Sequence, residues 1–250
     1  MLIAKGGQTM TVKIDYHAIR NLGYAMMADV WAVLGEHLTY LLVKDSSLTS
    51  LFTYVSWTFQ LLQIVCHVEI LASLFRLKGL NADYDKARQW YAMTVVTTAL
   101  SMAFLGLLSL RSNTVSLVPL ILTLSIYFIK ILVQAAGGRA ALRGTACLLD
   151  SFALEVRAAK NRRKGILLII SSAFLSVIVG ALGLIIYLIY VGSTDATGVF
   201  SPDDVPKVEI LWLAILLLST FAAVICWAVS RFLAAYAICR SYKEIKELTR

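Results

Sequence analysis

Acidic, imidazole and amide side chains recur inside two otherwise apolar stretches near the start of the chain. Asp29 and Glu36 lie seven residues apart and therefore share one face of a helix. Gln60, Gln63 and His67 follow at i, i+3 and i+7, which is also a single helical face. Histidine titrates near neutral pH, and carboxylates inside a membrane often line proton or ion pathways. This combination predicts a polar layer able to bind a proton or a cation.

Two interpretations of this polar layer remain open. In the functional one, the layer is a substrate site or ion path. In the structural one, interhelical hydrogen bonds and ion pairs hold a weakly apolar first helix in place. The candidate residues for the functional interpretation are Asp29, Glu36, His37, Gln60, Gln63 and His67.

A further carboxylate, Glu69, points to a different side of the second helix. Its expected depth resembles that of two cations in later apolar stretches, Lys130 and Arg231. An unpaired charge inside a membrane costs about 3 kcal/mol or more. We therefore expect Glu69 to form an intramembrane ion pair with Lys130 or Arg231.

Metal and catalytic chemistry find little support in the sequence. His37 and His67 are expected at different depths, and Cys66 and His67 are adjacent on a helix and diverge by about 100°. The motifs G-x-S-x-G, H-E-x-x-H and S-x-x-K are missing, as is the G-x-x-x-x-G-K-[ST] phosphate loop. We expect no metal and no cofactor, although an intramembrane enzyme using Glu36, His37 or His67 as acid or base remains an alternative.

The apolar residues that must position these side chains occur in long uninterrupted runs. The chain is 59% hydrophobic and 15% charged, whereas soluble domains average about 25% charged. A helix needs about 20 apolar residues to cross a bilayer. We predict an all-α, polytopic membrane bundle in which residues 1–250 form a single integral membrane domain with six spans, at about 21–43, 52–75, 90–110, 112–134, 166–192 and 210–236.

The distribution of charge predicts the orientation of these spans. Of the 23 Lys and Arg residues, only Lys44, Arg111 and Lys207 lie on the side opposite to the rest. This pattern satisfies the positive-inside rule. Both termini are therefore expected in the cytoplasm, with the spans paired as three hairpins. The net charge of +8 reflects this topology, so no nucleic-acid partner is predicted.

With this orientation, the polar residues of the first two spans fall at matching depths. Asp29 and His67 each lie about eight residues from the inner ends of their spans, and Gln60 and Gln63 are level with Glu36. Consecutive helices are usually neighbours. We therefore expect the two polar stripes to face each other.

The longest inner segment, 139–164, carries apolar residues at helical spacing among charged ones. This is typical of an amphipathic helix or pair of helices. Its apolar face is expected to lie on the inner membrane surface or on a protein partner. The residues that form that face are Leu142, Leu149, Phe152, Ala153 and Val156.

About 250 residues, six spans and both ends inside resemble the permease subunit of a two-component ATP-driven exporter. The resemblance is topological and extends over the whole chain. It implies transport across a membrane, a separate cytoplasmic ATPase and a homodimer.

The resemblance also implies a location, and we expect an integral protein of the bacterial cytoplasmic membrane with the lipid bilayer as its first partner. Two alternatives stay open besides the intramembrane enzyme. One is a stand-alone carrier or channel, and the other is a non-transport component such as a scaffold, sensor or immunity-type accessory subunit.

Overall fold

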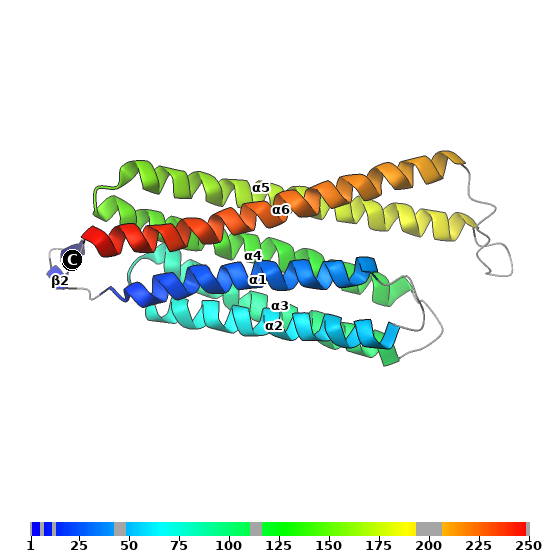
Figure 1. The fold of residues 1–250 in the computed structure, drawn as a ribbon, viewed down its shortest axis with the longest axis horizontal. Coiled ribbons are helices and arrows are strands. Elements are labelled where there is room, and N and C mark those ends of the chain that lie inside the picture. Colours follow the sequence, from blue (N-terminus) through cyan, green and yellow to red (C-terminus); the bar gives the residue numbers. More distant parts are fainter. Residues whose placement is uncertain are drawn as a thin grey trace.

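Six long helices follow a short N-terminal β-hairpin in the computed structural model, which describes residues 2–5, 8–11, 14–42, 49–110, 117–193 and 207–248 (Figure 1). Strands β1 and β2 pair antiparallel, with Leu2 opposite Thr11. The all-helical, six-helix bundle predicted from the sequence is confirmed. The elements are β1 Leu2–Lys5, β2 Gln8–Thr11, α1 Tyr16–Leu42, α2 Thr49–Arg76, α3 Ala82–Leu110, α4 Leu117–Ser151, α5 Glu155–Ser193 and α6 Lys207–Leu248.

The helices close into a ring. Each helix packs against the next one in the chain, α6 returns to pack against α1, and α4 also touches α6. Figure 1 shows the helices running side by side along the long axis of the molecule, with α5 and α6 continuing past the others at one end. The inward faces of six helices therefore enclose a common interior.

Three helices are long and apolar enough to cross a membrane over the residues described. These segments are Tyr54–Arg76, Glu155–Ala181 and Ala214–Leu248. Within the same residues α1 does not meet this criterion, and it carries Arg20, Asp29 and Glu36. The membrane character of the chain is thus supported, whereas spans in α1, α3 and α4 and the orientation of the termini stay predictions.

Side-chain caps and a left-handed glycine define helix ends at one end of the bundle. The carboxylate of Asp15 accepts from the backbone N–H of Ala18, 3.2 Å away, at the start of α1. Asn81 accepts from the N–H of Tyr84 at 3.0 Å at the start of α3 and donates to the carbonyl of Gly144 at 2.9 Å. Gly79, with φ of 79°, lies in the turn that ends α2. Asn81 therefore caps α3 and also joins its first turn to α4.

The inner segment 139–164 differs from the sequence prediction. It forms the end of α4 and the start of α5, joined by a tight turn at 152–154 in which Ala153 has φ of 58°. Leu142 and Leu149 are fully buried in the main apolar core, whereas Val156 is 71% exposed. Other helices of the same chain pack on Leu142, Leu149 and Phe152, so most of the face that was predicted to lie on the inner membrane surface or on a partner lies within the bundle.

The core consists of two apolar clusters of unequal size. The larger fills the end of the bundle that contains the α2–α3 and α4–α5 turns, and includes Leu74, Tyr84, Leu149 and Ile238. The smaller lies farther along the helices and includes Val33, Ile178 and Trp227. Buried polar side chains occur where one cluster gives way to the other, and they form the candidate site. The members of this polar layer are Asp29, Glu36, Gln60, Gln63, His67, Thr98, Lys130, Gln134 and Arg231.

Candidate functional site

An ion pair between the first and last helices is the centre of the polar layer. Asp29 on α1 is 0% exposed, and its Oδ2 accepts a hydrogen bond from the guanidinium of Arg231 on α6. The guanidinium carbon also lies 4.8 Å from the centre of the Trp227 ring, one helical turn earlier on α6. The pair therefore fixes α1 against α6 where the ring of helices closes.

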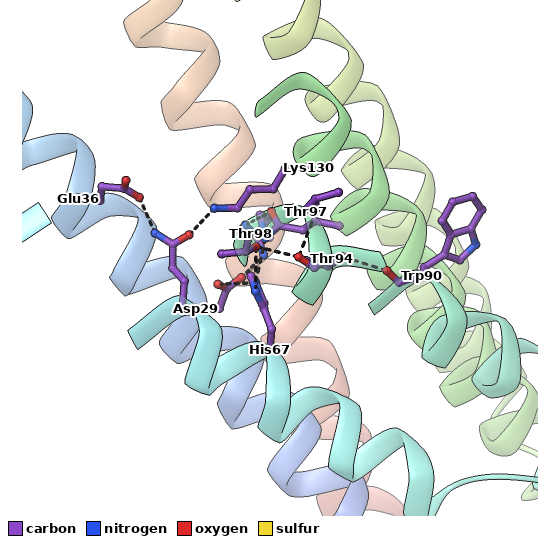
Figure 2. A network of polar contacts seen from close by, with 11 residues as sticks. Asp29, Glu36, His67, Trp90, Thr94, Thr97, Thr98 and Lys130 are labelled. Atoms are coloured by element: carbon purple, nitrogen blue, oxygen red, sulfur yellow. Dashed lines mark hydrogen bonds and ion pairs between the residues drawn. The ribbon is translucent and has the colours of Figure 1, made fainter. Parts of the chain in front are cut away.

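His67 on α2 lies directly beside this ion pair and is also 0% exposed. Its Nε2 is 2.9 Å from Oδ1 of Asp29 and 2.9 Å from the amide nitrogen of Gln134 on α4. Its Nδ1 is 3.4 Å from the hydroxyl of Thr98 on α3. Figure 2 shows Asp29, His67 and Thr98 converging from three helices.

The chemistry of Arg231 determines how the amide of Gln134 is oriented. Arginine only donates, so the amide oxygen of Gln134 faces Arg231, 3.2 Å from Nη1. The amide NH2 must then face His67, and it donates to an unprotonated Nε2. This assigns the ring proton to Nδ1, which faces the Thr98 oxygen, while the Thr98 hydroxyl donates to the carbonyl of Thr94 at 2.8 Å.

Neutral His67 leaves Asp29 incompletely satisfied. Among the residues described, Oδ1 of Asp29 receives no hydrogen bond, although Nε2 of His67 is only 2.9 Å away. A proton added to Nε2 of His67 would therefore lie between the imidazole and a carboxylate oxygen that has no other donor among the described residues.

Glu36, two helical turns after Asp29 on α1, is the centre of a second group of polar contacts. Its two carboxylate oxygens accept hydrogen bonds from the amides of Gln60, at 2.7 Å, and Gln63, at 2.5 Å, both on α2. The ammonium of Lys130 on α4 donates to the amide oxygen of Gln63 at 2.7 Å. Gln63 therefore links the carboxylate to the ammonium (Figure 2).

The polar layer is balanced in charge when His67 is neutral. Two carboxylates, Asp29 and Glu36, stand against two cations, Lys130 and Arg231. The side-chain atoms of this layer that lack a hydrogen bond within the described part of the chain are both acceptor oxygens, Oδ1 of Asp29 and Oε1 of Gln60. The unused bonding capacity therefore suits a proton or a cation better than an anion.

A small pocket adjoins both groups. It has room for about one water molecule, which excludes an organic substrate from this arrangement of the side chains. Its polar walls include members of the Glu36 group and Gln134. The pocket is lined by Val33, Glu36, Gln63, Tyr127, Lys130, Ile131, Gln134 and Trp227.

The structure brings together most of the residues singled out in the sequence. Asp29 contacts His67, and Glu36 contacts Gln60 and Gln63, as the matched depths predict. The function of these residues stays a prediction. The side chain of His37 lies outside the described residues.

The expected ion pair of Glu69 is wrong. Glu69 is exposed on the outer side of α2, while Arg231 pairs with Asp29 and Lys130 binds Gln63. Two residues of helix turn a side chain by about 200°, so Glu69 faces away from the interior that His67 enters. Depth alone placed the two cations correctly along the bundle and gave the wrong partner.

The sequence analysis missed two uncharged members of the layer, Thr98 and Gln134. A signal existed for Gln134, because it follows Lys130 by four residues and shares its helical face. Among the described side chains, no group of three His, Cys, Asp or Glu residues could hold a metal ion. No protein family, curated protein or solved structure matches this chain.

Proposed function

We propose that this chain is a membrane transport protein in which the buried polar layer takes up and releases a proton, or a similarly small cation, during transport. The observation that carries the proposal is the contact between Asp29 and His67. A fully buried carboxylate oxygen without a hydrogen bond lies 2.9 Å from an imidazole, inside a closed ring of helices.

Size and charge support a proton over a larger substrate. The adjoining pocket has room for about one water molecule. The two carboxylates and two cations of the layer cancel before protonation. An added proton therefore meets no net positive charge in the layer. Histidine is the residue type that most often exchanges a proton in proteins, and the layer contains one.

Protonation at this site would act on the contact that closes the ring of helices. An added proton on Asp29 or His67 weakens the attraction between Asp29 and Arg231, and this ion pair joins α1 to α6. A change in that contact gives the bundle a means to alternate between two packings of its helices. The polar layer would then couple proton binding to helix movement.

The proposal includes the transport apparatus predicted from the sequence. The chain carries no phosphate loop, so an ATP-driven step requires a separate cytoplasmic ATPase. We propose a permease-type subunit acting as a homodimer in the bacterial cytoplasmic membrane, with both termini inside. Purification from native membranes in a mild detergent tests this part, because a stoichiometric ATPase is then expected to co-purify.

A second candidate function is a non-transport membrane component, such as a scaffold or sensor subunit. The favouring observation is the balance of two carboxylates against two cations, because such a network can hold helices together without a ligand. The two functions make different predictions for proton movement.

Proton flux in proteoliposomes distinguishes the candidates. We expect His67→Gln to lower flux about tenfold or more by removing the titratable group, with the melting temperature changed little. The matched control is His17→Gln, because His17 is exposed at the start of α1 and the substitution is the same. Unchanged flux in a folded His67→Gln protein, or a wild-type protein that moves no protons with its co-purified partners, contradicts proton transport.

A further inference from the structure

A second pocket lies on the outside of the bundle, away from the polar layer. It has a volume of about 230 Å³ and is formed where α4 passes between α3 and α5. Its position and chemistry are independent of the proposed function. The lining residues are Asp83, Lys86, Trp90, Ala136, Arg139, Ala140, Arg143 and Ile169.

Three cations and one carboxylate line this pocket. Asp83 pairs with Arg143, with 3.7 Å between the carboxylate oxygen and Nε. Neither Lys86 nor Arg139 has an ion-pair partner among the residues described. The pocket therefore carries an excess of positive charge, which suits a phosphate group.

The stem of Arg139 is held by the neighbouring helix. A Cβ atom at Gly165 of α5 would lie only 3.3 Å from Cγ of Arg139 and 3.6 Å from its Cα. The glycine thus allows the half-buried arginine to pass close to α5. Arg139 is thus packed against α5 at the wall of the pocket.

The outward face of α4 changes from apolar to cationic side chains at the pocket. Leu122, Ile129 and Leu132 are exposed at 40%, 49% and 40%, and they recur at helical spacing. The same face continues through Ala136 to Arg139 and Arg143. The stripe of α4 is therefore apolar at Ile129 and Leu132 and becomes cationic at Arg139 and Arg143.

The flanking helices α3 and α5 also change from charged to apolar exposed side chains near the pocket. Trp90 of α3 is 38% exposed at the pocket, a position typical of an indole at a membrane–water interface. Beyond it, Met93 on α3 and Ile170 on α5 are exposed apolar residues. The pocket thus opens on an apolar outer surface, at the level where charged residues begin.

We propose that this pocket binds the phosphate of an anionic phospholipid, with the headgroup at Lys86 and Arg139 and an acyl chain along Leu132 and Ile129. Basic pockets between membrane helices recognise anionic headgroups in this way. Free phosphate has the same charge chemistry but makes no use of the apolar stripe, which favours the lipid.

Retention of phosphatidylglycerol by the purified, detergent-washed protein tests the proposal. We expect the wild-type chain to retain phosphatidylglycerol over phosphatidylcholine, and Arg139→Gln to reduce retention about tenfold, as expected for one charge-assisted contact. Arg163→Gln is the matched control, since Arg163 is an exposed cation on α5 outside the pocket. Millimolar inorganic phosphate should leave the lipid bound.

Three outcomes would overturn the lipid site. These are equal retention in Arg139→Gln and wild type, equal loss in Arg139→Gln and Arg163→Gln, and displacement of the lipid by phosphate alone. If Arg139→Gln does not fold, fluorescence quenching of the wild-type protein by brominated lipids decides. Brominated phosphatidylglycerol should then quench more than brominated phosphatidylcholine, and Trp90→Phe should remove this difference; no difference would contradict the proposal.

Discussion

The ion pair between Asp29 and Arg231 is the residue-scale feature with the largest expected effect on stability. Both side chains are buried, at 0% and 5% exposure. Removing one member of a buried ion pair leaves the other charged and desolvated, which typically costs about 3–5 kcal/mol. Replacing both members removes the uncompensated charge, so the two effects should not add.

A double-mutant cycle measures this coupling. We expect Asp29→Asn and Arg231→Gln each to lower the free energy of unfolding by about 3–5 kcal/mol, and the double variant to lose clearly less than the sum. The control is Glu244→Gln, which breaks the half-exposed contacts of Glu244 with Arg157 and Arg240 and should cost about 1 kcal/mol or less. Additive losses in detergent unfolding experiments would show that the two residues do not interact as described.

Two quantities limited the prediction of the site: the depth of each residue along its span, and the rotation of each helix about its axis. Depth followed from counting residues along each span, and it correctly placed Asp29 beside His67 and Glu36 beside Gln60 and Gln63. The rotation of a helix relative to its neighbours is set by packing, so Glu69 was assigned inward when it is exposed.

At the scale of elements, close approach between α1 and α6 depends on a glycine. A Cβ atom at Gly23 would lie 2.4 Å from Sγ of Cys239 and 3.2 Å from the backbone oxygen of Ala235. These distances are shorter than ordinary contacts, so a larger residue requires the Cys239 side chain to turn away and the two backbones to move slightly apart. This contact lies on the same helix pair as the Asp29–Arg231 ion pair.

Alanine substitution of two glycines tests this packing. We expect Gly23→Ala to lower the free energy of unfolding by about 1–3 kcal/mol through overpacking. Gly180→Ala is the control, because its Cβ would meet Phe128 at an ordinary 3.5 Å, and the better helix propensity of alanine should leave stability equal or slightly higher. Equal melting temperatures for the two variants would show that α1 and α6 are not in close contact at Gly23.

The sequence located the helices well but underestimated how far they extend. Hydropathy marks the apolar part of a helix, so the sixth span was predicted at 210–236, whereas α6 continues to Leu248. Its last turns are held by contacts within the chain, such as the 3.0 Å hydrogen bond between Asn161 and Ser241. The inner segment 139–164 was misinterpreted for the same reason, since its apolar residues pack on other helices of this chain.

At the scale of the whole molecule, closure of the ring could not be predicted from the sequence. Neighbouring helices in the chain are expected to pack together, but the contact between α1 and α6 joins the most distant pair. Asp29 and Arg231, 202 positions apart, form part of that contact. The polar layer is enclosed only because this pair closes the ring.

The predicted orientation rests on the distribution of Lys and Arg, and it implies opposite environments for the two ends of the bundle. The α2–α3 turn carries the exposed Lys78 and should face the cytoplasm, whereas the acidic 194–206 connection should face outward. Native Cys147 is a poor reporter, because burial raises the pKa of its thiol and leaves little reactive thiolate at neutral pH. An introduced cysteine on an exposed turn avoids this difficulty.

Cysteine labelling in intact and opened cells therefore tests the arrangement of the whole molecule. In a chain whose four native cysteines are replaced by serine, we expect Asp204→Cys to react with a membrane-impermeant maleimide in intact cells. Lys78→Cys should react only after the membrane is permeabilised, because its turn lies on the inner side. Reaction of Lys78→Cys in intact cells would reverse the orientation, and it would also move the cationic pocket at Arg139 to the outer leaflet.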